Sequence, residues 1–151
     1  MVEMDKDNKK AYIFAVGRRK SSVARVRVYQ TLKEDVVIAG EKVKKGDFFV
    51  NDKKVENYFS GPVFSAIYLE PLRAVNVLGK YSITVKVVGG GPKGQLDAVV
   101  HGVSRALSVI DEKNRNILKK KGLLTRDARV RQRRNVGMGG KSRRKKQSPK
   151  R

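Results

Sequence analysis

Basic side chains near the start of the chain have the types and spacing that bind phosphate groups. Three consecutive cations are followed by two hydroxyl residues and by two arginines at alternate positions: Arg18, Arg19, Lys20, Ser21, Ser22, Arg25 and Arg27. A guanidinium group offers a planar fork of N–H donors that matches two phosphate oxygens. The pattern predicts a phosphate-binding turn that continues along one face of a strand.

The C-terminal segment carries a second and denser group of cations. Residues 126–151 hold twelve Lys or Arg residues and one acid, Asp127. Such a segment buries too little apolar surface to offset the entropy of ordering it alone. We expect an extended tail that becomes ordered on a polyanion. Together with the lysines before it, its candidate contacts are Lys119, Lys120, Lys121, Arg126, Arg129, Arg131, Arg133, Arg134, Lys141, Arg143, Arg144, Lys145 and Lys146.

The distribution of charge favours nucleic acid as the partner. Residues 113–151 contain seventeen basic residues and one acid, whereas residues 1–112 contain nineteen and thirteen, and the pI is ≈ 10.6. A membrane surface is not expected, because residues 125–151 contain no aromatic residue and no leucine to insert into it. No base-reading helix and no aromatic pair on a strand stands out. We therefore expect contacts with the shape and phosphates of a folded RNA, while a general nucleic-acid-compacting protein stays open.

Catalysis, cofactor binding and metal binding receive no support from the sequence. The single histidine, His101, shares a helix face with Asp97 and Arg105 at four-residue steps. This spacing predicts an ordinary exposed face or an RNA-facing surface with His101 and Arg105 as contacts. Residues 135–142 end in Gly-Lys-Ser, as a nucleotide-binding phosphate loop does, but Asn135 occupies the position where that loop needs its first glycine. The chain has no cysteine, and we predict no enzyme, no cofactor and no metal site.

A sheet is needed to hold the first group of cations. Residues 12–29 contain two β-like runs around Gly17, with the basic turn directly after that glycine. Alternation over residues 24–29 puts apolar side chains on a core face and the arginines and a tyrosine on the other face. Turn residues 51–52 separate two short strands, and a further strand covers residues 81–88.

Helical periodicity accounts for most of the remaining chain. Apolar residues from Leu96 to Ile110 form one stripe at helical spacing, which predicts a long helix packed on the sheet. Residues 111–121 predict a short helix that ends at Gly122. Short helices are predicted within residues 55–78. Interruptions are expected at Gly61–Pro62 and at Pro71, and Gly79 is expected to end the last helix.

The order of these elements predicts an α+β fold, with a small mixed sheet and helices on one face. We expect a flexible N-terminus over residues 1–10, a globular RNA-binding domain over residues 11–122 and the basic tail over residues 123–151. The N-terminus has no apolar leader, and no apolar run is long enough to cross a bilayer. A cytoplasmic location is expected, and an organellar origin of a processed chain stays open.

Three separated segments carry a resemblance to a known family. GRRKSSVARVRV, GPKGQLDAVVHGVSRAL and LLTRDARVRQRR occur in that order. In this order they resemble the bacterial form of the universal small-subunit ribosomal protein nine, from about Tyr12 to Arg151. The resemblance implies a fold similar to the second domain of small-subunit ribosomal protein five, with a left-handed βαβ crossover. The general expectation for such a crossover is right-handed, so this handedness comes from the resemblance alone.

The resemblance also implies a structural, non-enzymatic role in the head of the small ribosomal subunit. Expected partners are small-subunit ribosomal RNA, neighbouring head proteins and peptidyl-site transfer RNA. Residues 18–22 match the family's basic loop, and Lys150 and Arg151 are expected to approach the transfer RNA backbone. The family commonly has an aromatic residue and a serine before the final Lys-Arg, whereas this chain has Ser148 and Pro149 there.

Overall fold

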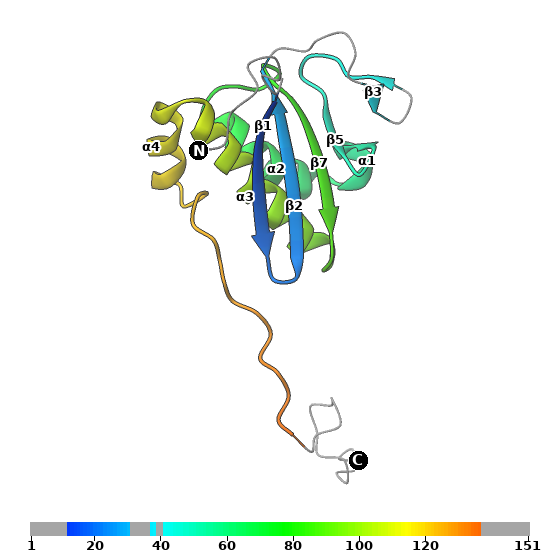
Figure 1. The fold of residues 1–151 in the computed structure, drawn as a ribbon, viewed down its shortest axis with the longest axis vertical. Coiled ribbons are helices and arrows are strands. Elements are labelled where there is room, and N and C mark those ends of the chain that lie inside the picture. Colours follow the sequence, from blue (N-terminus) through cyan, green and yellow to red (C-terminus); the bar gives the residue numbers. More distant parts are fainter. Residues whose placement is uncertain (1–11, 31–36, 39–40, 137–151) are drawn as a thin grey trace, which may run out of the picture.

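The computed structural model describes residues 12–30, 37–38 and 41–136. Its main feature is a five-stranded sheet with the order β1-β2-β7-β5-β6 (Figure 1). The strands are β1 (Tyr12–Arg19), β2 (Ser22–Tyr29), β5 (Phe48–Val50), β6 (Lys53–Lys54) and β7 (Ser82–Val88). Strands β5 and β7 are parallel and the other neighbours are antiparallel, so the sheet is mixed as predicted. Two short strands, β3 (Val37–Ile38) and β4 (Glu41–Lys42), form a separate pair.

The helices gather on one face of this sheet, which confirms the predicted α+β arrangement. They are α1 (Val55–Tyr58), α2 (Pro62–Ala74), α3 (Pro92–Ile110) and α4 (Glu112–Lys120). Helix α3 packs on β1 and β2, and α2 and α4 pack against α3 (Figure 1). The apolar stripe of α3 is buried there with the inward residues of β2 and β7, which form the core. No helix in the described ranges is long and apolar enough to cross a membrane.

The closest approach of helix and sheet involves two glycines. A Cβ atom added at Gly17 would lie 1.9 Å from the Ala98 carbonyl oxygen, and one added at Gly102 would lie 2.6 Å from Val26 Cγ2. The prediction that the basic turn begins after Gly17 is therefore wrong, because Gly17 lies inside β1 and faces α3. The turn itself is formed by Lys20, with a φ of 51°, and by Ser21.

Helix α2 differs from its prediction at one proline. It runs through Pro71 without a break, although proline removes a backbone donor from a helix interior. Pro71 is fully buried beside Leu72, and this packing holds the segment helical. The break before Pro62 is confirmed, because Gly61 has a φ of 115° and Pro62 begins the helix. The helix ends at Ala74, well before the glycine that was expected to stop it.

The other connections follow the sequence pattern. The residues between β5 and β6 are Asn51 and Asp52, both with positive φ, which confirms the predicted turn. Strand β7 passes into α3 through a glycine turn over residues 89–91. Helix α4 is followed by Gly122, with a φ of 71°. These connections bring the basic hairpin, helix α3 and the start of the C-terminal segment together.

Candidate nucleic-acid interface

The hairpin between β1 and β2 carries the first group of predicted contacts. Its register pairs Arg19 with Ser22, so Lys20 and Ser21 form the tip. Arg18, Lys20 and Ser21 are exposed. Ser22 is fully buried, and its hydroxyl donates to the Gly89 carbonyl at 3.1 Å. Ser22 was predicted to contact phosphate. The structure corrects this prediction for the side chain, because the alternation along β2 points it inward.

Arg19 is enclosed by the protein. Its side chain is 16% exposed, and its guanidinium nitrogens lie 2.9 Å from Asp127 Oδ2 and 3.7 Å from Asp97 Oδ2. Arg19 also donates to the Arg129 carbonyl at 2.8 Å. Both acids come from distant parts of the chain, α3 and the C-terminal segment. The side chain that looked like a phosphate ligand therefore joins β1, α3 and the C-terminal segment.

Asp127 and Arg129 complete this junction. Arg129 donates from its backbone N–H to Asp127 Oδ1 at 2.9 Å and from Nη2 to Oδ2 at 2.7 Å. The hydrogen bonds from Arg129, aided by its charge and that of Arg19, hold the pKa of Asp127 well below its ordinary range. The carboxylate therefore stays ionised at neutral pH. We call residues 123–129, with these contacts, the tail root.

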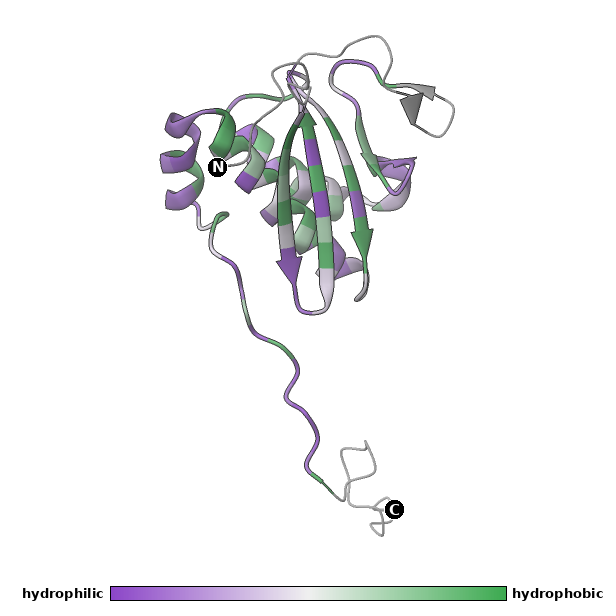
Figure 2. Ribbon diagram, in the orientation of Figure 1, coloured by the Kyte–Doolittle hydropathy of each residue, from purple (hydrophilic) through white to green (hydrophobic). Residues whose placement is uncertain are grey.

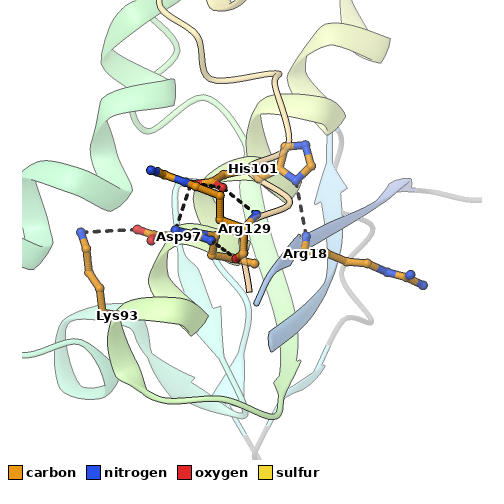
Figure 3. Close-up of polar contacts among 7 residues, drawn as sticks. Arg18, Lys93, Asp97, His101 and Arg129 are labelled. Carbon is orange, nitrogen blue, oxygen red and sulfur yellow. Dashed lines mark hydrogen bonds and ion pairs between the residues drawn. The ribbon is translucent and has the colours of Figure 1, made fainter. Parts of the chain in front are cut away.

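His101 is half-buried between β1 and the tail root. Its Nδ1 accepts a hydrogen bond from the Arg18 backbone N–H at 3.4 Å (Figure 3). Burial is the main cause that lowers the pKa of His101; a hydrogen bond to the Leu124 backbone opposes it, and the charges of Arg105 and Arg126 add to it. The neutral imidazole is favoured. The predicted exposed face is thus partly covered at His101, and Arg105 on the same face donates to the Val16 carbonyl.

Arg25 and Arg27 lie on the face of β2 away from the helices and are exposed, as the alternation predicted. Figure 2 shows the corresponding alternation of hydrophilic and hydrophobic bands along β2. Lys86 of β7 pairs with Arg25 in the sheet register and is exposed beside it. The sequence interpretation missed Lys86, although the alternation of residues 83–88 places it on this face. Tyr29 shares the face but is buried, with its ring centroid 5.6 Å from that of Tyr12.

Strand β1 carries two aromatic residues on its outward side. Tyr12 and Phe14 are two residues apart on β1, and two-residue spacing puts side chains on the same face of a strand. Phe14 is 50% exposed. The expectation that no aromatic pair on a strand serves base stacking stays a prediction, and these two residues are where it can be tested.

The later cations lie at the end of α4 and along the C-terminal segment. Lys119, Lys120 and Lys121 at the end of α4 are exposed, as are Arg126, Arg129, Arg131 and Arg133, whereas Arg134 is half-buried. Residues 126–135 form no helix or strand, and Figure 1 shows this segment leaving the sheet and helices behind. The other predicted contacts lie outside the described residues: Lys141, Arg143, Arg144, Lys145, Lys146, Lys150 and Arg151.

The geometry favours binding over bond chemistry. A cleft of ≈ 350 Å³ lies between the end of β1, α3 and the tail root. Its two acids, Asp97 and Asp127, are both paired with cations. Within the described ranges, no three His, Cys, Asp or Glu side chains gather as metal ligands would. The described side chains that are available for binding include the exposed cations of the hairpin, the outward side of β2 and the C-terminal segment.

Comparison with known proteins agrees with the resemblance noted in the sequence. The family model described as "Ribosomal protein S9/S16" matches residues 17–151. The "Small ribosomal subunit protein uS9" of Solidesulfovibrio magneticus is 40% identical over 129 residues, which cover 85% of this chain and 89% of the relative. The protein of the same name from Maridesulfovibrio salexigens is 43% identical over 131 residues, covering 87% and 91%. The chain therefore belongs to the ribosomal protein S9/S16 family.

Proposed function

We propose that this chain is a structural component of the small ribosomal subunit that binds ribosomal RNA without catalysing a reaction. The observation that carries the proposal is the tail: its root is bound to the domain through Arg19 and Asp127, and the residues after it extend with exposed arginines. The names of the two relatives, small ribosomal subunit protein uS9, support the assignment. The proposed location is the ribosome, in the cytoplasm.

The physical basis is a division of work between domain and tail. A folded domain supplies a fixed surface, with Arg18 and Lys20 at the hairpin tip and Arg25 and Arg27 on the outer strand face. The tail follows the phosphate backbone into places too narrow for a domain and becomes ordered only when phosphates neutralise it. Each neutralised phosphate makes the affinity salt-dependent, with a slope of about −0.7 to −0.9 log units per log unit of salt.

The finer assignments come from the family resemblance. We propose that the domain lies in the head of the subunit beside other head proteins, and that Lys150 and Arg151 approach peptidyl-site transfer RNA. We also propose that the β5-to-β7 connection is the left-handed crossover of the second domain of small-subunit ribosomal protein five. The parallel pairing of β5 and β7, with α2 behind the sheet in Figure 1, supports this connection.

Sedimentation of a cell extract tests the ribosomal assignment. The tagged full-length chain should travel with small subunits at moderate salt. A chain found only in the free pool at the top of the gradient would contradict the proposal. In a second measurement, the purified chain should bind small-subunit ribosomal RNA more tightly than duplex DNA; equal affinities would favour a general nucleic-acid-compacting protein instead.

Removal of the last two residues tests the transfer RNA contact separately. Small subunits that carry the chain without Lys150 and Arg151 should assemble normally but retain peptidyl-site transfer RNA less well. The matched control replaces Lys145 and Lys146 with alanine, which removes the same charge from an earlier part of the tail. Equal transfer RNA retention by the shortened and the complete chain would contradict the contact while leaving the ribosomal assignment intact.

A further inference from the structure

The face of the sheet opposite the helices is a second surface with its own composition. We call the outward residues of its three long strands the outer face: Tyr12, Phe14, Val16, Arg18, Val23, Arg25, Arg27, Tyr29, Ser82, Thr84, Lys86 and Val88. Their inward neighbours, such as Val26 and Val85, form the core under α3. In Figure 1 the large helices α2 and α3 lie behind this face.

The charge of the outer face has one sign. Its four cations are Arg18, Arg25, Arg27 and Lys86, all exposed, and it includes no acid. The tail root differs, because Asp97 and Asp127 there pair with Arg19. Within the described ranges these cations form no ion pair, and a surface of one charge sign is complementary to a polyanion. The occupant that fits this face is therefore a nucleic-acid strand.

An exposed aromatic ring lies among these cations. Phe14 is 50% exposed, and the sheet register places it opposite Arg27 of the neighbouring strand. The Arg27 guanidinium carbon lies 5.0 Å from the centre of the Tyr12 ring, which holds that ring and the arginine together. The next pair along the strands is Val16 with Arg25, and Arg25 is opposite Lys86 in turn.

This combination distinguishes unpaired from paired RNA. A base in a duplex is stacked on both sides and offers only its edges, whereas an unpaired base offers a free π-face to an aromatic side chain. Neighbouring strands lie about 4.8 Å apart. Arg25 and Arg27 are one strand away from Phe14 and Lys86 is two strands away, which is close enough for phosphates flanking a stacked base. An exposed phenylalanine contributes nothing to phosphate binding. The presence of Phe14 among these cations therefore points to contact with a base.

We propose that the outer face binds an unpaired segment of RNA, with one base stacked on Phe14 and the flanking phosphates on Arg25, Arg27 and Lys86. The proposal rests on the proposed RNA-binding function and adds to it a site that binds unpaired bases. The tail and the hairpin tip contact phosphates whether or not the RNA is paired. The outer face selects single-stranded RNA because stacking on Phe14 requires a free base.

The test uses the full-length chain and oligoadenylate at a salt concentration that weakens the phosphate contacts of the tail. Phe14→Ala should lower the affinity about tenfold, the lower part of the range for one stacked base, and should leave the salt slope unchanged. Val109→Ala is the matched control, because Val109 is an exposed apolar residue of α3, 68% accessible, away from the outer face. Its affinity should equal that of the wild type.

Two further variants separate stacking from folding. Phe14→Tyr should bind as the wild type does, whereas Phe14→Leu, which keeps apolar bulk but no π-face, should resemble Phe14→Ala. Short-wavelength ultraviolet crosslinking should attach the oligonucleotide to the peptide that contains Phe14. Wild-type affinity of Phe14→Ala, or an equal loss of binding to base-free polyphosphate, would overturn the proposal. Failure of the ribosomal assignment has a different signature, the absence of the wild-type chain from small subunits.

Discussion

The tail root and the outer face contain the same kinds of basic residue, yet they use them in opposite ways. Arg19 and Arg25 belong to one hairpin. Arg19 is bound by two acids, whereas Arg25 faces outward beside Lys86 and pairs with no acid of the part of the chain that the structure describes. At the tail root, the cation serves the fold. On the outer face, the exposed cation is the one that we propose to bind RNA. The comparison shows that arginines of one hairpin differ in their electrostatic surroundings, because folding brings two acids of distant segments to Arg19.

The largest expected effect comes from a substitution at the contact between β1 and α3, which supports both the tail root and the outer face. Gly17→Ala places a Cβ atom against the backbone of α3, where neither Ala98 nor Gly102 can give way. We expect a loss of unfolding free energy of at least about 3 kcal/mol, the upper range for overpacking, measured by urea denaturation. The control is Gly91→Ala, where an added Cβ meets nothing within 4 Å. Equal stability of the two variants would show that α3 shifts without penalty.

Alanine substitution at Arg19 and at Arg25 tests the comparison directly. Arg19→Ala leaves Asp97 and Asp127 without their shared partner, so we expect a loss of about 1 to 2 kcal/mol in unfolding free energy. Arg25→Ala should change stability by less than about 0.5 kcal/mol. The RNA measurement should reverse the order, with Arg25→Ala lowering the salt slope by about 0.7 to 0.9 and Arg19→Ala leaving it unchanged. The same slope loss in both variants would break the distinction.

Asp127→Asn affects the tail root alone. The amide keeps the size of the side chain but loses the charge that pairs with Arg19 and Arg129. Limited trypsin digestion should cleave faster after Arg126 and Arg129, because the root no longer holds the segment against the hairpin. The thermal unfolding midpoint of the domain should change little, since the core does not include Asp127. Cleavage at the wild-type rate would mean that Arg19 does not hold the tail.

The smallest expected effect concerns pH. The pKa of His101 in the fold lies below its ordinary value of 6.5, so the unfolded chain binds the proton more readily. The stability of the fold should therefore decrease as the pH falls below about 6.5. The folding equilibrium constant should fall by at most about tenfold per pH unit, because one proton is involved. His101→Gln should remove this component, measured as the difference between the two unfolding curves at mildly acidic and neutral pH. A constant difference across that range would contradict it.

The sequence contained the local parts of this structure. Alternation along residues 24–28 predicted which arginines face outward, and the apolar stripe from Leu96 predicted α3 and its buried side. Both patterns depend only on the repeat of a strand or helix, which is the same in every protein. The family resemblance was also present in the sequence and is confirmed by the family match.

The long-range parts could not be read in the same way. Nothing local in the sequence indicates that Arg19 meets Asp97 and Asp127, which are far away in the chain and adjacent only after folding. Gly17 looked like a turn residue because glycine serves both turns and close approaches, and only the position of α3 distinguishes them. Pro71 looked like a helix break because its burial was not visible.

The tail root also fixes a point from which lengths along the chain can be counted. Beyond Arg129 each residue adds at most about 3.5 Å of reach, so Arg134 can contact a phosphate only within about 18 Å of that point, plus the length of its side chain. One residue inserted after Arg129 would shift every later side chain to a different phosphate, whereas the contacts of the hairpin and the outer face would keep their places. In the proposed complex, the Arg19–Asp127 pair therefore sets the register between the tail and the RNA.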